Sequence, residues 1–162
     1  MSTKLKKALK IALLVLIVFN VAFIFTQSIL PPEESSKESS AVGGVIEDII
    51  PPETKPGEFI QTNLRKIAHF VEFATLGAEV SLFVVLFVRR RIVAFLSFPT
   101  ALIVGFFDET IQLFSGRGAS VKDVWIDFFG FASAALIFYT GYLVAYLIRN
   151  NVNKSVHETA VK

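Results

Sequence analysis

Three separated stretches of the chain carry ionisable or amide side chains inside or beside segments that are otherwise apolar. Their polar members are Arg65, Lys66, His69, Glu72, Asp108, Glu109, Gln112, Arg117, Asp123 and Asp127. A charge at the centre of a membrane helix costs about 2.5–3.5 kcal/mol even on lenient insertion scales, so such residues usually face a protein interior or a wet cavity. We therefore expect these side chains to form a functional cluster.

The spacing within each stretch places its polar side chains on one helix face. Arg65, His69 and Glu72 follow an i, i+4, i+7 pattern. Asp108 with Gln112, and Asp123 with Asp127, are i, i+4 pairs, which also share a helix face. Arginine and lysine bind phosphate or carboxylate groups. Carboxylates with one histidine can instead bind a divalent metal or exchange protons with a substrate. The residue types suit both kinds of chemistry.

Composition favours a membrane protein. The chain is 53% hydrophobic and contains 17 phenylalanines and no cysteine, whereas soluble domains are usually about 45–50% apolar. The absence of cysteine excludes disulfides and thiolate metal sites or nucleophiles. The sequence shows no nucleotide-binding loop, protease triad or basic nucleic-acid-binding stripe, so we expect no nucleic-acid partner.

Four apolar segments are long enough to cross a bilayer, which takes about 20 residues. They are Ile11–Leu30, Ile67–Val88, Ile92–Phe114 and Val124–Ile148. The first could also be read as a signal peptide, but its apolar run is long and no Ala-x-Ala cleavage site follows. The sequence therefore predicts an all-α, polytopic membrane protein with four transmembrane helices in a domain covering residues 11–148.

The basic residues predict the orientation of these helices. They gather in residues 1–10, in the Arg89–Arg91 run and at the start of the tail 149–162. Short basic loops stay in the cytoplasm, so we expect a multi-pass protein of the cell membrane with both termini cytoplasmic. The connections 31–63 and 115–123 then lie outside.

The long outer connection divides by composition. Pro31–Ser40 is rich in proline, serine and glutamate, and we expect it to be mobile. Val42–Ile50 has apolar residues at helical spacing, which predicts a short amphipathic helix on the outer surface.

This topology brings the three polar stretches to one membrane face. With a rise of 1.5 Å per residue, the acids Glu72, Asp108, Glu109 and Asp127 fall at a common depth, about 5–10 Å below the outer boundary. We therefore predict a polar cluster at the outer face of the helix bundle.

The connection before the last span has its own features. Gly116-Arg117-Gly118 can turn tightly and bring Arg117 back over the cluster. Ser120 is a good helix N-cap, with Asp123 placed as its reciprocal acid.

Two features lie deeper in the predicted bilayer. Glu79 is at the level of Asn20 and Tyr139, and we expect it to make a hydrogen-bonded helix contact. The small residues of Gly130–Ala135 predict a close-packing face on the last helix.

The polar stretches resemble the VanZ-like membrane protein family. The resemblance rests on Arg65-Lys66-Ile67-Ala68-His69-Phe70-Val71-Glu72-Phe73 with Leu76-Gly77, on Asp108–Phe114, and on Arg117 with Ser120–Gly130. Ser115, Asp127 and Phe73 depart from the residues common there, which are proline, asparagine and tyrosine. The resemblance implies a cell-envelope protein connected with low-level resistance to the glycopeptide teicoplanin.

Three functions fit the cluster, and we favour the first. The ten polar residues would bind an outer-leaflet lipid headgroup, a glycolipid or a cell-wall precursor, without a cofactor. The second function is a metal- or acid/base-dependent enzyme acting on such a lipid; its candidates are His69, Glu72, Asp108 and Glu109, with no catalytic residue assigned. The third is a purely structural cluster, because apolar surface gives little drive for helix association in lipid.

Overall fold

The computed structural model describes residues 2–88 and 92–160, so the Arg89–Arg91 run, interpreted as a cytoplasmic anchor, lies outside the described residues. The described chain is helical, with elements α1 (Thr3–Ile29), α2 (Pro32–Glu47), α3 (Lys55–Phe87), α4 (Ile92–Phe114) and α5 (Val121–Ala160). Four of these helices, α1, α3, α4 and α5, are long and apolar enough to cross a membrane. The predicted fold class is confirmed.

Three of the predicted spans are parts of longer helices, since α1 already begins at Thr3 instead of Ile11. α3 begins at Lys55 instead of Ile67, and α5 continues to Ala160. The Thr54 hydroxyl caps α3 by accepting a hydrogen bond from the Gly57 amide at 3.2 Å. An apolar run marks only the part of a helix that suits hydrocarbon, and nothing after Gly57 breaks the helix before the apolar run begins.

The segment expected to be mobile is helical, so that prediction was wrong. α2 starts at Pro32 and ends at Glu47, where the sequence predicted a helix over Val42–Ile50. Proline suits the first helical position, and the acids of the first turn, Glu33 and Glu34, favour the positive end of the helix dipole. Three serines of α2, Ser36, Ser39 and Ser40, donate their hydroxyls to backbone carbonyls three or four residues earlier, as serines inside helices commonly do.

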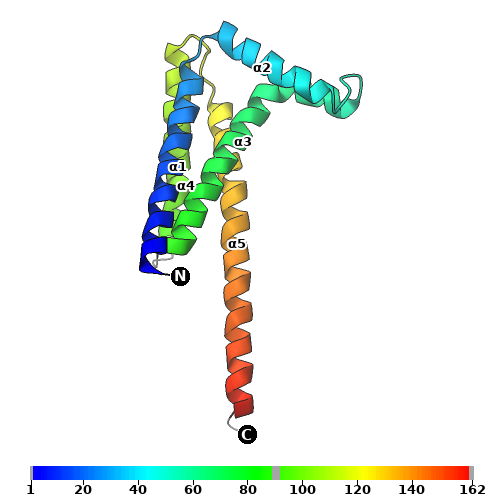
Figure 1. The fold of residues 1–162 in the computed structure, drawn as a ribbon. Coiled ribbons are helices and arrows are strands. Elements are labelled where there is room, and N and C mark those ends of the chain that lie inside the picture. The colour runs from blue at the N-terminus through cyan, green and yellow to red at the C-terminus, as the bar shows by residue number, and fades with distance from the viewer. Residues whose placement is uncertain (1, 89–91, 161–162) are drawn as a thin grey trace.

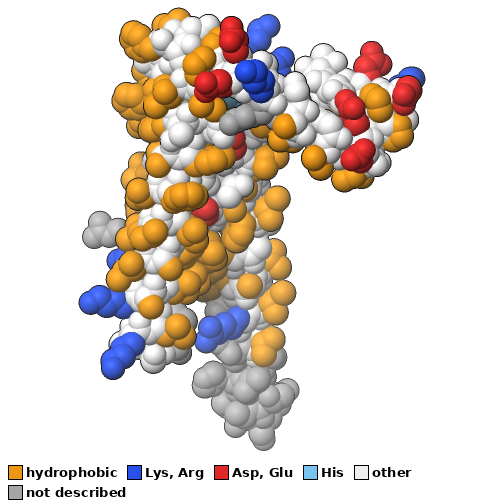
Figure 2. Space-filling model, turned by 45° about the horizontal axis from the view of Figure 1, so that its top comes forward, with side chains coloured by type: hydrophobic (Ala, Val, Ile, Leu, Met, Phe, Trp, Pro, Cys, Tyr) orange, Lys and Arg blue, Asp and Glu red, His pale blue; other side chains and the backbone are white. Residues whose placement is uncertain are grey.

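The four long helices form a bundle, and α2, residues 48–54 and the first turns of α3 form an arm that projects sideways from one end of it (Figure 1). We call this the α2 end. α1 begins at the opposite end of the bundle, and α5 extends beyond that end. The arm carries four exposed hydrophobic residues, Val42, Val45, Ile49 and Phe59, and Figure 2 shows hydrophobic side chains along its lower edge.

α3 and α5 cross backbone against backbone. A Cβ atom on Gly77 would lie 2.4 Å from the Phe131 carbonyl oxygen, and one on Gly130 would lie 2.4 Å from the Phe70 carbonyl oxygen. The predicted close-packing face over Gly130–Ala135 is thus confirmed. Small residues let two helices approach in lipid, where dispersion contacts replace the hydrophobic effect.

The deeper polar residues pair across helices. Asn20 donates its side-chain amide to the Glu79 carboxylate at 3.2 Å, which confirms the expected contact between α1 and α3. Tyr139 makes a different pair, because its hydroxyl lies 3.1 Å from the Ser97 hydroxyl of α4. These two pairs join α1 to α3 and α4 to α5 below the cluster.

Candidate functional site

A histidine from α3 lies between two aspartates from α4 and α5. His69 Nδ1 is 3.5 Å from an oxygen of Asp108 and 3.4 Å from an oxygen of Asp127. Both aspartate side chains are 0% exposed and the histidine side chain is 12% exposed. The prediction that distant stretches bring their carboxylates together with basic residues is confirmed for this group; its binding role stays a prediction.

Glycine contacts set this arrangement. The Gly130–Phe70 contact lies one residue from His69 on α3 and three residues from Asp127 on α5, so the helix crossing brings these two side chains together. On α4, a Cβ at Gly105 would stand 3.4 Å from both the Cβ and an oxygen of Asp127. These are ordinary van der Waals distances, so Asp127 packs directly beside Gly105 of α4.

Asp108 is held by hydrogen bonds on both oxygens. The Ser28 hydroxyl of α1 donates to Oδ1, and the Gln112 amide donates to Oδ2 at 2.7 Å. The Arg65 guanidinium of α3 donates in turn to the side-chain oxygen Oε1 of Gln112. This chain of donors runs from Arg65 to Asp108 and joins three helices around one buried carboxylate.

Glu109, and not Asp123 as the sequence predicted, accepts the hydrogen bond from the backbone amide of the N-cap residue Ser120. The Ser120 hydroxyl accepts a hydrogen bond from the Lys122 amide at 3.2 Å, so Ser120 caps α5 as predicted. The Ser120 amide, however, donates to Glu109 Oε2 at 2.7 Å. The capping acid thus comes from α4, because the connection folds back until Ser120 meets the end of that helix.

Arg117 turns back onto the bundle, as the flanking glycines predicted. Gly116 and Gly118 have φ values of 79° and 77°, a backbone region that other residues rarely adopt. The Arg117 Nη1 donates to the Gln27 carbonyl oxygen at 2.6 Å, whereas its buried Nε has no hydrogen-bond partner among the described residues. Burial and the nearby positive charge of Arg65 lower the pKa of the Arg117 guanidinium.

The remaining predicted residues lie around the group. Glu72 is half-buried and near enough for its charge to interact with His69, Asp108 and Arg117. Lys66 and Asp123 line a cavity of about 250 Å³ with Arg65 and His69. All ten predicted residues therefore lie at or near the α2 end, with Lys66 and Asp123 at its rim.

The sequence did not predict that α1 contributes a residue, Ser28, to the site. Ser28, which is buried, donates to Asp108, and its carbonyl accepts from Ser115 at 2.9 Å. The polar run Thr26–Ser28 at the end of an apolar segment was the available signal, since depth counting places it level with the other polar stretches. Gly105 left no comparable signal in the sequence.

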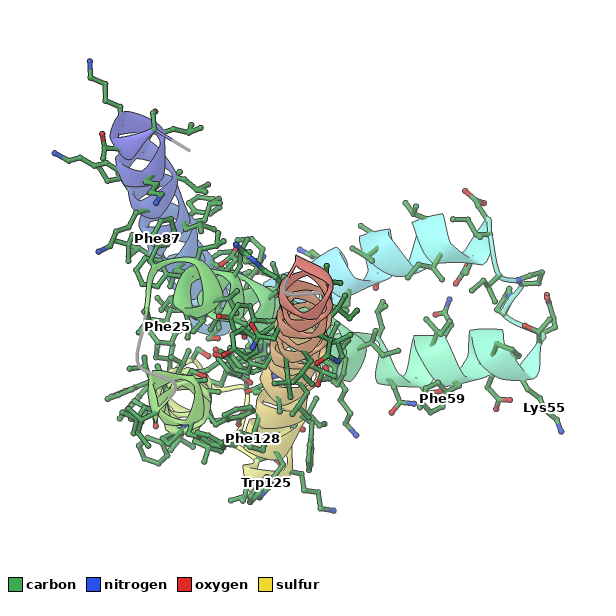
Figure 3. All side chains as sticks on the ribbon, turned by 90° about the horizontal axis from the view of Figure 1, so that it is seen from below. Phe25, Lys55, Phe59, Phe87, Trp125 and Phe128 are labelled. Atoms are coloured by element: carbon green, nitrogen blue, oxygen red, sulfur yellow. The ribbon has the colours of Figure 1, made fainter. Side chains whose placement is uncertain are left out.

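A groove of about 380 Å³ separates α1, α2 and α3 beside this group. Its apolar wall is formed by Phe23, Val42, Ile46, Leu64, Ile67 and Val71. Its polar end contains Arg65, His69 and Arg117, and the two arginines also line an adjoining cavity of about 400 Å³ with serines of α2. Figure 3 looks along the bundle and shows the arm, with Lys55 and Phe59, projecting away from it.

These features define a polytopic helical membrane protein whose polar cluster is buried at one end of the bundle. The family model for VanZ/LLP1 matches residues 11–148, and the chain belongs to this family. The match confirms the resemblance carried by the polar stretches. No match was found among curated proteins or among solved structures.

Proposed function

We propose that this VanZ-family protein binds an anionic lipid of the outer leaflet, either a phospholipid, a glycolipid or a lipid-linked cell-wall precursor. The observation that supports this is the groove between α1, α2 and α3, which joins an apolar wall to two arginines. An acyl or prenyl chain would lie on the wall, and a phosphate or carboxylate would contact Arg65 and Arg117.

The two arginines suit an anion. A guanidinium group presents donors in a fork that matches phosphate and carboxylate oxygens. The Nε of Arg117 is buried without a hydrogen-bond partner among the described residues, so it has a donor to offer. The charge of Arg65 is close enough to Arg117 to lower the pKa of the Arg117 guanidinium, and a bound anion would relieve this repulsion.

The arm supports binding at headgroup level. Its exposed Val42, Val45, Ile49 and Phe59 suit the boundary between headgroups and acyl chains, where amphipathic helices lie. We place the α2 end outside and both termini in the cytoplasm, following the distribution of basic residues. In this orientation the groove opens toward lipids of the outer leaflet.

We extend the proposal to antibiotic susceptibility, in keeping with the family resemblance. A protein that holds a cell-wall precursor or an anionic lipid at the outer surface would change what a glycopeptide such as teicoplanin meets there. Deleting or overexpressing the protein should then shift teicoplanin susceptibility, and the variant Arg117→Lys should reduce that shift.

The test compares lipid retention by the wild type and by Arg117→Lys. Lysine keeps the positive charge and can still donate to the Gln27 carbonyl, but it lacks the fork. We expect native mass spectrometry in mixed micelles to show phosphatidylglycerol retained over phosphatidylcholine by the wild type, and less phosphatidylglycerol retained by Arg117→Lys.

The matched control is Lys122→Ala, which removes an exposed cation near the same connection but outside the groove. It should retain phosphatidylglycerol like the wild type. Equal retention of the two lipids by the wild type, or an equal loss in the two variants, would contradict the proposal.

A further inference from the structure

We infer that His69, Asp108 and Asp127 bind one divalent transition-metal cation, of the Zn²⁺ or Mn²⁺ class, at the polar end of the groove. The ligand atoms would be His69 Nδ1 and one carboxylate oxygen from each aspartate. This inference goes beyond lipid binding and does not depend on it. It rests on the positions of the three ligands, on the burial of Asp127 and on the charges around them.

The ligand atoms are already at coordination spacing. All three lie within 4.8 Å of one another, and the histidine nitrogen is 3.5 Å and 3.4 Å from the two aspartate oxygens. Ligands about 2.0–2.1 Å from Zn²⁺ stand roughly 3.3 Å apart at a tetrahedral angle. One cation between the three atoms would therefore need only a small side-chain adjustment.

Asp127 has two buried oxygens that need a partner. Its side chain is 0% exposed, and neither oxygen has a hydrogen-bond partner among the described residues. His69 Nδ1 also has no hydrogen-bond partner among these residues; it lies 3.4 Å from Asp127 Oδ1, so a protonated His69 would form an ion pair with that oxygen and leave Oδ2 without a partner. A buried carboxylate without a compensating charge or donor is strongly unfavourable. A cation bound here would compensate this carboxylate and the histidine nitrogen together.

Charge and orientation favour the same site. Five acids interact electrostatically around it, and the neighbouring cations are Arg65 and Arg117; the acids are Glu72, Asp108, Glu109, Asp123 and Asp127. Because acids outnumber these cations, a divalent cation would neutralise more of the negative charge than a single proton shared between two carboxylates. The donors to Asp108 from Ser28 and Gln112 fix the orientation of that ligand, as hydrogen-bonded neighbours of metal ligands usually do.

The ligand types select the class of metal. Imidazole nitrogen with carboxylate oxygens suits Zn²⁺ or Mn²⁺, whereas Ca²⁺ and Mg²⁺ prefer oxygen ligands alone. His69 lines both the groove and the cavity of about 250 Å³ beside α5. Asp108 and Asp127 are fully buried and line neither space, so a cation would reach them past the His69 ring.

The first experiment measures metal in the purified wild type. The protein is extracted in detergent without chelator, incubated with Zn²⁺ or Mn²⁺, and dialysed before mass spectrometry of the elements. We expect about one metal ion per chain, because three protein ligands with an open position are typical of a mononuclear site. X-ray absorption of the Zn²⁺ form should show a histidine and oxygen neighbours at about 2.0–2.2 Å.

The second experiment uses an isosteric pair of variants. Asp127→Asn keeps the side-chain shape and removes the charged ligand, and it should lose most of the metal. Glu79→Gln makes the same kind of change at an acid of α3 outside the site, and it should keep the metal. Gln112→Ala should weaken metal affinity about 10- to 100-fold, since it frees a ligand that the amide orients.

Three outcomes would overturn the inference. These are a wild type without metal after incubation, equal metal content in Asp127→Asn and the wild type, and an absorption spectrum without histidine. The absorption and metal measurements on the wild type apply even if Asp127→Asn fails to fold. A wild type that binds no metal but still retains phosphatidylglycerol would reject this site alone, and a wild type that binds metal but shows no lipid selectivity would reject only the proposed lipid binding.

Discussion

Gly130 of α5 faces the backbone of Phe70 in α3 so closely that a Cβ atom at position 130 would lie 2.4 Å from the Phe70 carbonyl oxygen. His69 is the neighbour of Phe70, and Asp127 lies one helical turn before Gly130. The same close approach therefore packs the two helices and sets the separation of two site residues. Packing and site geometry are coupled through this contact.

A methyl group at this contact should separate the helices. We expect Gly130→Ala to lower the free energy of unfolding by roughly 1–3 kcal/mol, because the added carbon meets backbone and not a flexible side chain. Thermal unfolding in detergent micelles would measure the change. The variant should also weaken metal binding, since His69 and Asp127 would move apart.

The same helix offers a matched control. Gly141 has no atom within 4 Å of its virtual Cβ among the described residues. Gly141→Ala should be neutral or stabilising by up to about 1 kcal/mol, because alanine favours a helix interior. If both variants melt alike, the tight crossing of α3 and α5 is wrong.

The connection before α5 gives a second prediction. Glu109→Ala removes the buried acceptor of the Ser120 amide and should lower the free energy of unfolding by about 1–3 kcal/mol. Glu109→Gln keeps an acceptor oxygen and should have a smaller effect. Reversible unfolding in mixed micelles would measure each change.

Asp123→Ala tests whether Asp123 or Glu109 is the acid that caps the start of α5. The sequence assigned the reciprocal cap to Asp123, whereas the Ser120 amide donates to Glu109. Asp123→Ala should therefore change stability by no more than about 0.5 kcal/mol. A larger effect for Asp123→Ala than for Glu109→Ala would restore the capping box predicted from the sequence.

Orientation can be tested with single cysteines, since the chain contains none of its own. Cysteines at Ser36 and Ala119, both exposed at the α2 end, should react with a membrane-impermeant maleimide on intact cells. A cysteine at Asn151 should react only after the cells are opened. The reverse pattern would place the groove at the cytoplasmic leaflet and remove the proposed outer-leaflet ligand.

Much of the architecture follows from local properties of the sequence. Long apolar runs can satisfy their backbone only as helices in a bilayer, so the all-α class and the four spans were predictable. A charge in hydrocarbon is energetically unfavourable, so the polar residues within the apolar segments were expected to gather in one cluster. Apolar runs could not show that α3 and α5 continue past them, nor that Pro32 starts a helix, because those helix ends depend on capping and not on hydropathy.

Only the tertiary structure decided which members of the cluster meet. His69 lies between Asp108 and Asp127, Ser28 and Gln112 hold Asp108, and Glu109 caps α5. A helical pattern shows which residues share a face, but it does not show which neighbour that face contacts or at what distance. Here Gly77 and Gly130 set the rotation and separation of α3 and α5 by meeting backbone atoms of the other helix. That complementarity exists only once the two helices have packed.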